Sequence, residues 1–502
     1  MIRKLTLAAA LVLAAPAMAA DEGGYATYEL ALRAGQLENA ADALVAVLED
    51  PEQAADHGKA WRAIATLLET QGLPYASLVA WSHAIATDAQ STAGDIAKVM
   101  DLAASLSDEE ILGPVLGSNV GIQGLDAPTR SRMAYVAARH QLRRGNLGTA
   151  LGILMMVEEG TPVFAHAMAL RGVVLANQGR HADAVTPLVT AQATARQAAD
   201  FPEADRFDDV VELNIARTYY GAGNWTQAIE WFNRVDRKSE YWAQAQFERA
   251  WAHFRNDDMQ QALAALHTHD TPFFDGWYWP EADLLRAYAL FTLCKFGSAT
   301  AEINEFVETY TPVSEALGSQ LGALDEAAAF ADARTFVEGG TPKLPPMMLR
   351  DFRHDDRFAE AVAGTDKAKE ELAKLAKMTD RPFVRAAREW VTDRRDERVA
   401  EEGARVLDRA RKARAELSQT LQAAEITRVD MLQMQAEMYE RATETGKLDF
   451  GDQIGKLRNL RKARKGYRVW PYQGEVWADE LGWFTVDARA DCPESLAEGK
   501  AR

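Results

Sequence analysis

Long apolar runs are almost absent from this sequence of 502 residues. The one clear run, residues 5–15, is shorter than the roughly 20 residues that a membrane-spanning helix needs, which argues against a transmembrane segment. Arg3 and Lys4 precede this run, and an Ala-Met-Ala cleavage site follows it at 17–19. Residues 1–19 are therefore predicted to be a secretory signal peptide, and we expect export to the periplasm.

Cysteine is also scarce, with only Cys294 and Cys492 in the chain. Neither cysteine stands directly after the predicted cleavage site, so a lipid anchor of the bacterial lipoprotein type is excluded. The two thiols could pair in an oxidising compartment, and the bond would tie the tail to the middle of the chain. The alternative is two unpaired thiols, at least one of them buried, and the sequence spacing does not decide between the two.

Basic residues are outnumbered, because 56 Lys and Arg stand against 74 Asp and Glu, for a formal net charge of -18. This acidic balance argues against a nucleic-acid partner and allows attraction to basic ligands. Alanine is abundant and β-branched residues are sparse, a composition that favours helix. The chain is longer than most domains that fold around a single hydrophobic core. Repeat proteins can be this long because each unit packs only on its neighbours.

What the sequence does contain is an internal repeat with a period of 34 residues. In the segment NIARTYYGAGNWTQAIEWFNRV, 214–235, two small residues lie twelve positions apart, with a glycine between them. The same small pairs recur as Ala65/Ser77, Ala138/Ala150, Gly172/Ala184, Ala216/Ala228, Ala250/Ala262 and Ala287/Ala299. Each period is predicted to form two antiparallel helices that cross where both residues are small.

A large side chain lies four positions after the second small residue and is expected to pack against the next unit. These side chains are Trp81, Leu154, Leu188, Phe232, Leu266 and Ile303. A glycine at the turn, such as Gly179 or Gly223, suits the left-handed conformation that ends a first helix. We place the repeat array in 131–337 and degenerate helical repeats in 20–130.

A 34-residue helix-turn-helix period with these small and large positions resembles the tetratricopeptide repeat (TPR). The resemblance covers 130–312 well and 21–90 loosely. It departs where the repeat usually has Trp, since this chain has Glu212 and Gln246, and most units lack the terminal proline. The resemblance implies an all-α superhelix of helical hairpins whose first helices line a concave surface.

Aromatic and arginine side chains are expected on this concave surface. Counting from the small residue of each first helix gives Leu213, Arg217, Tyr220, Phe247, Trp251, Phe254, Arg255, Leu284, Tyr288 and Phe291. Aromatic residues and Arg dominate binding hot spots, and large exposed apolar patches are rarely left empty. These residues are predicted to form a partner-binding groove, unless the C-terminal part of the same chain covers them.

The composition changes after the repeats. The Gly- and Pro-rich segment 338–352 is predicted to be a linker, and 353–455 to form long charged helices, one of about 60 residues starting at Pro382. An apolar seam for another helix consists of Val399, Val406, Ala410, Ala413, Leu417, Leu421 and Ala424. The partner could be a second chain, giving self-association, or the helix near 356–378, and intramolecular packing is the default.

The last segment, 456–502, combines a basic run with a cluster of aromatic residues. The basic run, 456–468, is interpreted as a solvated helix face, with attraction to an acidic partner as the alternative. In VWPYQGEVWADELGWF, 469–484, a short helix would place two apolar side chains on one face, four positions apart. The predicted anchor residues are Trp470, Pro471, Gly474, Trp477, Leu481 and Gly482.

This motif, after long helices and an exported TPR array, also resembles periplasmic repeat proteins of deltaproteobacteria, including ones linked to adventurous gliding motility in myxobacteria. The matching residues are Trp470, Pro471, Gly474, Glu475, Trp477, Asp479, Glu480, Leu481 and Gly482. The resemblance implies a scaffold within an envelope-spanning complex.

No catalytic motif, metal site or cofactor site is predicted. Glu475 and Asp479 would be neighbours on one short helix, with no opposite wall for a glycosidase substrate. Glu494-Ser495 lacks the glycine-rich stretch that follows the Glu-Ser motif of peptidoglycan lyases. His267 and His269 could offer two metal ligands, but the sequence suggests no third or fourth.

The sequence therefore predicts an exported TPR scaffold, not an enzyme, that binds protein partners in a bacterial envelope complex such as motility or secretion machinery. The alternative is a repeat protein of envelope biogenesis or export that binds peptidoglycan or polysaccharide, with the groove aromatics stacked on sugar rings.

Overall fold

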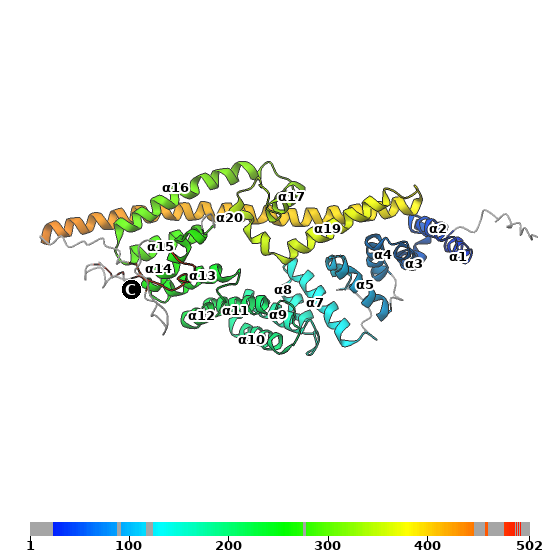
Figure 1. Cartoon of the computed structure of the whole chain (residues 1–502), viewed down its shortest axis with the longest axis horizontal. Helices are drawn as coiled ribbons and strands as arrows, with labels where there is room; N and C mark the ends of the chain where they lie inside the picture. The colour runs from blue at the N-terminus through cyan, green and yellow to red at the C-terminus, as the bar shows by residue number, and fades with distance from the viewer. Residues whose placement is uncertain are drawn as a thin grey trace, which may run out of the picture. The chain divides into compact units, whose positions relative to one another are not determined.

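The computed structural model describes residues 24–87, 92–116, 124–274, 278–445, 457–459, 476–486, 488, 490 and 492 (Figure 1). The predicted signal peptide lies outside these residues. The chain divides into two compact units. Unit 1 comprises 1–102 and 368–393, and unit 2 comprises 103–367 and 394–502.

The described residues are almost entirely helical, which confirms the all-α class. Up to residue 197 the helices are α1 (Tyr25–Arg33), α2 (Leu37–Glu49), η1 (Pro51–Asp56), α3 (His57–Thr70), α4 (Pro74–Thr87), α5 (Ala93–Ser105), η2 (Glu109–Leu112), α6 (Gly113–Leu116), α7 (Ala127–Arg143), α8 (Leu147–Leu154), α9 (Phe164–Asn177) and α10 (His181–Gln197).

The remaining elements include two short strands near the C-terminus. They are α11 (Ala204–Gly221), α12 (Trp225–Phe232), α13 (Trp242–Arg255), α14 (Met259–His267), η3 (Thr268–Asp270), η4 (Pro272–Phe274), α15 (Pro280–Thr292), α16 (Phe296–Leu321), α17 (Glu326–Val337), α18 (Pro346–Leu349), η5 (Arg350–His354), α19 (Asp356–Leu375), α20 (Pro382–Thr445), β1 (Leu457–Asn459) and β2 (Phe484–Val486). Across the part of the chain that the structure describes, no helix is both long and apolar enough to cross a membrane.

Consecutive helices pack as hairpins at the small residues of the repeat. In unit 2, α9 packs on α10, α11 on α12, α13 on α14 and α15 on α16, and in unit 1 α3 packs on α4. Where α9 crosses α10, a Cβ on Gly172 would overlap Leu188 and lie 3.1 Å from the Ala184 carbonyl oxygen. Where α3 crosses α4, the Ser77 hydroxyl donates to the Ala65 carbonyl at 2.8 Å. The predicted hairpin repeat is confirmed.

The predicted large side chains and turns also occur as expected. Trp81, Leu154, Leu188, Phe232, Leu266 and Ile303 are all buried. The turn glycines have positive φ, for example 75° at both Gly179 and Gly223. In the next two units the same turn position is held by Asp257 and Cys294, with φ of 61° and 56°. The left-handed turn is therefore kept where glycine is not.

The long helix α20 has 64 residues and buries its seam against its own chain. Val406, Ala410 and Ala413 belong to a core with residues of α17, α18 and α19. Leu417 and Ala424 belong to a second core with α15 and α16, and Figure 1 shows α16 beside α20. Val399 and Leu421 are only half-buried. The structure thus shows the intramolecular alternative, with α16 and α17 as additional neighbours that the sequence does not indicate.

The segment predicted to be a linker, 338–352, contributes to the core of unit 2. Leu344, Leu349 and Phe352 are buried in the cluster that includes Val406 of α20. The carboxylate of Asp332 accepts hydrogen bonds from the backbone N–H groups of residues 343 and 344, at 2.5 and 2.8 Å. Glycine and proline therefore mark a turn that is packed and hydrogen-bonded.

Candidate partner-binding surface

The structure divides the predicted groove residues into interior and surface side chains. Leu213, Phe247 and Leu284 are buried in the cores between helices, so the prediction that they face a concave surface is wrong. They lie three residues before the small crossing residue, at positions that pack against the neighbouring helix. Arg217 and Arg255 are exposed, and the remaining aromatic residues are half-buried.

Two adjacent first helices, α11 and α13, present a connected set of rings and guanidinium groups. The Tyr220 ring meets the Trp225 ring edge-on, with centroids 4.9 Å apart. The Arg255 guanidinium lies 5.3 Å from the Trp225 ring centroid, within cation–π range. Trp251 and Phe254 form a further edge-to-face pair at 5.9 Å.

Trp225 is a surface residue that counting along the first helices misses, because it begins the second helix α12. Its place directly after the turn residue Asn224 is the signal that could identify it. Burial raises the pKa of Tyr220, whose phenol lies beside this ring. We define the aromatic face as Arg217, Tyr220, Trp225, Trp251, Phe254 and Arg255.

An ion pair holds α11 and α13 in register at the aromatic face. The Arg217 guanidinium donates to both carboxylate oxygens of Glu248, at 2.8 and 2.6 Å. A bidentate pair of this kind fixes the orientation of the guanidinium plane. Because nearly half of the Arg217 side chain remains exposed, it stays accessible to a ligand.

The first-helix residues of the last repeat unit lie beside the core that α20 helps to form. Tyr288 and Phe291 pack at the edge of the core that contains Leu417, Ala424 and Met431 of α20. Phe254 of α13 packs at the edge of the same core. The candidate surface on α11 and α13 is therefore distinguished by its two exposed arginines, Arg217 and Arg255.

The C-terminal strap, which we define as 476–486 together with 488, docks on unit 2. Leu481, Phe484, Val486 and Ala488 are buried. The Arg237 guanidinium donates to the carbonyl oxygens of residues 478 and 479, at 2.7 and 3.0 Å. The Gly482 N–H donates to the Thr268 hydroxyl at 3.2 Å. Gly482 has φ of 79°, and a Cβ there would lie 2.7 Å from the Trp242 ring.

The strap borders part of the aromatic face, because Tyr220 packs against the cluster that contains Leu481 and Phe484, and Phe254 against the cluster that contains Val486 and Ala488. The strap touches Trp242 near the start of α13 and packs β2 on α14. At about 100° per residue, Trp242 lies half a turn away from Trp251. The described part of the C-terminal segment therefore leaves Trp251 and Arg217 uncovered.

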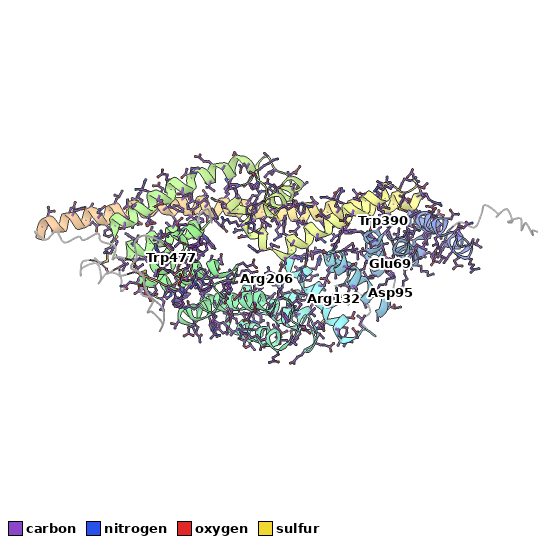
Figure 2. All side chains as sticks on the ribbon, viewed as in Figure 1. Glu69, Asp95, Arg132, Arg206, Trp390 and Trp477 are labelled. Carbon is purple, nitrogen blue, oxygen red and sulfur yellow. A yellow bond between two sulfur atoms is a disulfide. The ribbon has the colours of Figure 1, made fainter. Side chains whose placement is uncertain are left out.

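Several expectations for the anchor need correction. Residues 478–482 form turns and not a helix. Trp477, labelled in Figure 2, is 59% exposed, while Leu481 is buried. The two residues therefore do not share a buried face. In the basic run, Leu457–Asn459 is a strand paired antiparallel with β2, with Arg458 opposite Thr485, and not part of a helix. Trp470, Pro471, Gly474 and Glu475 lie outside the described residues.

A disulfide joins the region beyond the strap to the repeat array. Cys294 and Cys492 are bonded, with their Cα atoms 5.1 Å apart. Cys294 occupies the left-handed turn between α15 and α16. The bond therefore fixes the end of the chain beside this hairpin.

A charged cleft of about 920 Å³ lies in unit 2 between α11, the loop before α13 and the start of α19. Its lining is Arg196, Glu203, Asp205, Arg206, Asp208, Asp209, Glu212, Arg234, Asp236, Lys238, Ser239, Glu240, Arg353, His354, Asp355, Asp356 and Ala359. Arg206, labelled in Figure 2, donates to Glu240 at 2.6 Å and to Asp356 at 2.9 Å. These bonds join the first helix α11 to α19.

The two histidines of the predicted cluster have structural contacts. Burial lowers the pKa of His269 to about 4, and its Nε2 lies 3.0 Å from the Ala243 carbonyl oxygen. The His267 ring meets the Phe484 ring edge-on at 4.7 Å. Among the described residues, no group of three or more His, Cys, Asp or Glu side chains is arranged to hold a metal ion.

No protein-family model matches the chain, and no curated protein matches its sequence. Several solved helical-repeat structures are similar to it. A tetratricopeptide repeat protein from Parabacteroides merdae is 12% identical, with 56% of this chain and 90% of that chain covered and a TM-score of 0.27. The apo form of RapI is 10% identical, with coverage of 77% and 95% and a TM-score of 0.33. The TPR domain of P58(IPK) is 15% identical, with coverage of 77% and 97% and a TM-score of 0.18. The assignment of a TPR-like fold therefore stands on the hairpins and their crossings.

Proposed function

We propose that this chain is an exported scaffold that holds a partner protein on its aromatic face. The observation behind the proposal is that Tyr220, Trp225, Trp251 and Arg255 stay partly exposed on adjacent helices with the strap in place. Aromatic and arginine side chains held rigidly in this way are the usual centres of protein interfaces. The hairpin array supplies the rigid support.

We extend the proposal to a bacterial envelope complex, such as motility or secretion machinery. The predicted signal peptide at 1–19 supports an exported protein. The aromatic motif at 469–484 supports the envelope complex through its resemblance to gliding-motility repeat proteins. Both remain sequence-based proposals.

The test is affinity capture of the full chain from crosslinked cell envelopes. We expect wild type to recover a specific protein, and Trp251→Ala to recover at least tenfold less of it, because the variant removes the central ring of the face. Ile426→Ala is the matched control, since Ile426 is 64% exposed on α20 and outside the face. Equal recovery by Trp251→Ala, or no specific protein with wild type, would refute the proposal.

Binding of peptidoglycan or polysaccharide is the second candidate function. The observation in its favour is that Trp477 and Trp483 of the strap are 59% and 55% exposed, and indole rings of this kind stack well on sugars. Co-sedimentation with purified sacculi separates the two candidates. Pelleting of wild type that is lost in Trp477→Ala would favour the glycan, and absence of pelleting would remove it.

A further inference from the structure

The charged cleft has an excess of acidic side chains, and most of its arginines are already engaged. The lining has nine Asp and Glu against five Arg and Lys. Arg196 pairs with Asp208 and Glu212, and Arg206 is shared among Glu203, Glu240 and Asp356. The cations of the cleft are therefore largely neutralised by part of its acids.

Two of the three remaining cations, Arg234 and Arg353, lie over aromatic rings. The Arg234 guanidinium lies 3.8 Å from the Trp231 ring centroid, and Arg353 lies 4.5 Å from that of Phe336. Within the described ranges, no Arg or Lys side chain forms an ion pair with Asp205, Asp209 or Asp236. A negative surplus thus remains at the N-terminal half of α11.

Crowding of these acids leaves their charge partly uncompensated. Burial raises the pKa of Asp209, hydrogen bonds from the Asp236 N–H and the Ser239 hydroxyl oppose this, and the charges of Asp236 and Asp208 add to the rise. Burial also raises the pKa of Glu212, again with a contribution from Asp208. Like charges held this close are stabilised when a cation enters between them.

The cleft and the aromatic face are continuous along one helix. Arg206, Arg217 and Tyr220 lie on one side of α11, at spacings of eleven and three residues, which are about three turns and one turn of an α-helix. A segment bound across the aromatic face therefore reaches the acidic lining without leaving α11.

We infer that the charged cleft binds a cationic segment of the partner protein, rich in Lys or Arg, next to the aromatic face. The inference rests on the proposed function and adds the chemistry of the partner. The segment's cations pair with the exposed Asp205 and Asp236, which have no cation of their own, while the buried Asp209 adds negative charge beneath them. The net charge of the chain, -18, attracts such a segment from a distance.

The test measures binding of a fluorescein-labelled hexa-arginine peptide to the full chain by fluorescence anisotropy. The double variant Glu203→Lys/Asp205→Lys reverses two exposed acids of the cleft. The matched control, Glu338→Lys/Asp408→Lys, changes the net charge by the same amount at exposed acids elsewhere. We expect the cleft variant to bind at least tenfold more weakly than the control at equal ionic strength.

The neutral pair Glu203→Gln/Asp205→Asn should give an intermediate loss, and urea unfolding checks that each variant is folded. Equal weakening by cleft and control variants would show attraction to net charge alone and overturn the inference. Tighter binding of hexa-glutamate, through Arg234, Lys238 and Arg353, would also overturn it. Capture of a partner that depends on Trp251 but not on the cleft acids would leave the proposed function standing and refute only the inference.

Discussion

At the scale of single residues, small side chains determine how closely the repeat helices approach. Gly172 faces Leu188 and the Ala184 carbonyl oxygen, and Gly403 of α20 lies against the Glu326 carbonyl at the start of α17. Neither site has room for a methyl group. These contacts explain why small residues recur in the sequence at the positions where two helices cross.

Gly172→Ala should therefore destabilise the protein by about 1–3 kcal/mol, because the new Cβ overlaps Leu188 in a packed core. Gly152→Ala is the control. Nothing lies within 4 Å of a Cβ at that exposed helical position, so the change should be neutral or stabilise by up to about 1 kcal/mol. Urea unfolding midpoints compare the two, and equal midpoints would contradict the crossing model.

Asp283 of α15 should make stability depend on pH. Burial raises its pKa to about 6, with smaller opposing contributions from Arg286 and the Tyr310 hydroxyl. The folded pKa lies above the unfolded value of about 3.9, so the folded state binds the proton more tightly. Its stabilising contribution is present below about pH 4 and is lost as the pH rises to about 6.

Asp283→Asn should remove this loss and be more stable than wild type at pH 7 by about 1–3 kcal/mol, with a smaller difference at pH 4. Glu308→Gln, at an exposed position of α16, is the control and should differ little at either pH. Urea unfolding at the two pH values measures the differences. If the unfolding free energies of wild type and Asp283→Asn differ by the same amount at both pH values, burial of Asp283 does not raise its pKa.

At the scale of elements, the strap is held by a few contacts and one covalent bond. Phe484 and Val486 of β2 are buried, as is Ala488, and the Gln260 side chain of α14 donates to the Ala488 carbonyl at 3.1 Å. The Cys294–Cys492 disulfide limits how far the end of the strap can move from the α15–α16 turn.

Cys492→Ser should speed hydrogen exchange at Gly482 and Trp483 roughly tenfold or more, which corresponds to about 1.4 kcal/mol of lost docking free energy. Wild type treated with a dithiol reductant should show the same increase, and amides in the middle of α13 should not change. Unchanged exchange at both strap amides would mean that the noncovalent contacts alone hold the strap.

The repeat hairpins, the turns and α20 could be predicted from the sequence, because each follows from local periodicity and turn chemistry. The inward position of Leu213 and the docking side of the strap could not. Both depend on contacts between residues far apart in sequence, such as that of Gly482 with Trp242. The charged cleft could not be predicted from the sequence for the same reason, since its acids come from α11, the loop before α13 and the start of α19.

At the scale of the whole molecule, the chain forms two compact units, and unit 1 combines the N-terminal hairpins with residues 368–393. Glu371 shows how this combination is stabilised. Its buried carboxylate accepts hydrogen bonds from the N–H groups of Tyr75 and Ala76, both at 2.7 Å. The carboxylate thus supplies acceptors for two backbone N–H groups in the first turn of α4. This helix begins at Pro74, and the sequence before it offers no side chain that could cap it.

Glu371→Ala should destabilise unit 1 by about 2–4 kcal/mol, because two buried N–H groups lose their acceptor. Hydrogen exchange should rise across 57–87 and stay unchanged across 164–267 in unit 2. Glu370→Ala, at the exposed neighbouring position, should alter neither region. An equal rise in both regions would show that the two units unfold as one.

The disulfide makes attachment of the strap depend on synthesis of the chain as far as Cys492. Its two cysteines are 198 residues apart, and the second comes after α20 and the strap have been made. A chain that ends between Cys294 and Cys492 keeps Cys294 as a free thiol and lacks the bond that fixes the strap. A free thiol at Cys294 therefore identifies a molecule whose strap is not tied to the α15–α16 turn, and a thiol-reactive reagent distinguishes it from the bonded form.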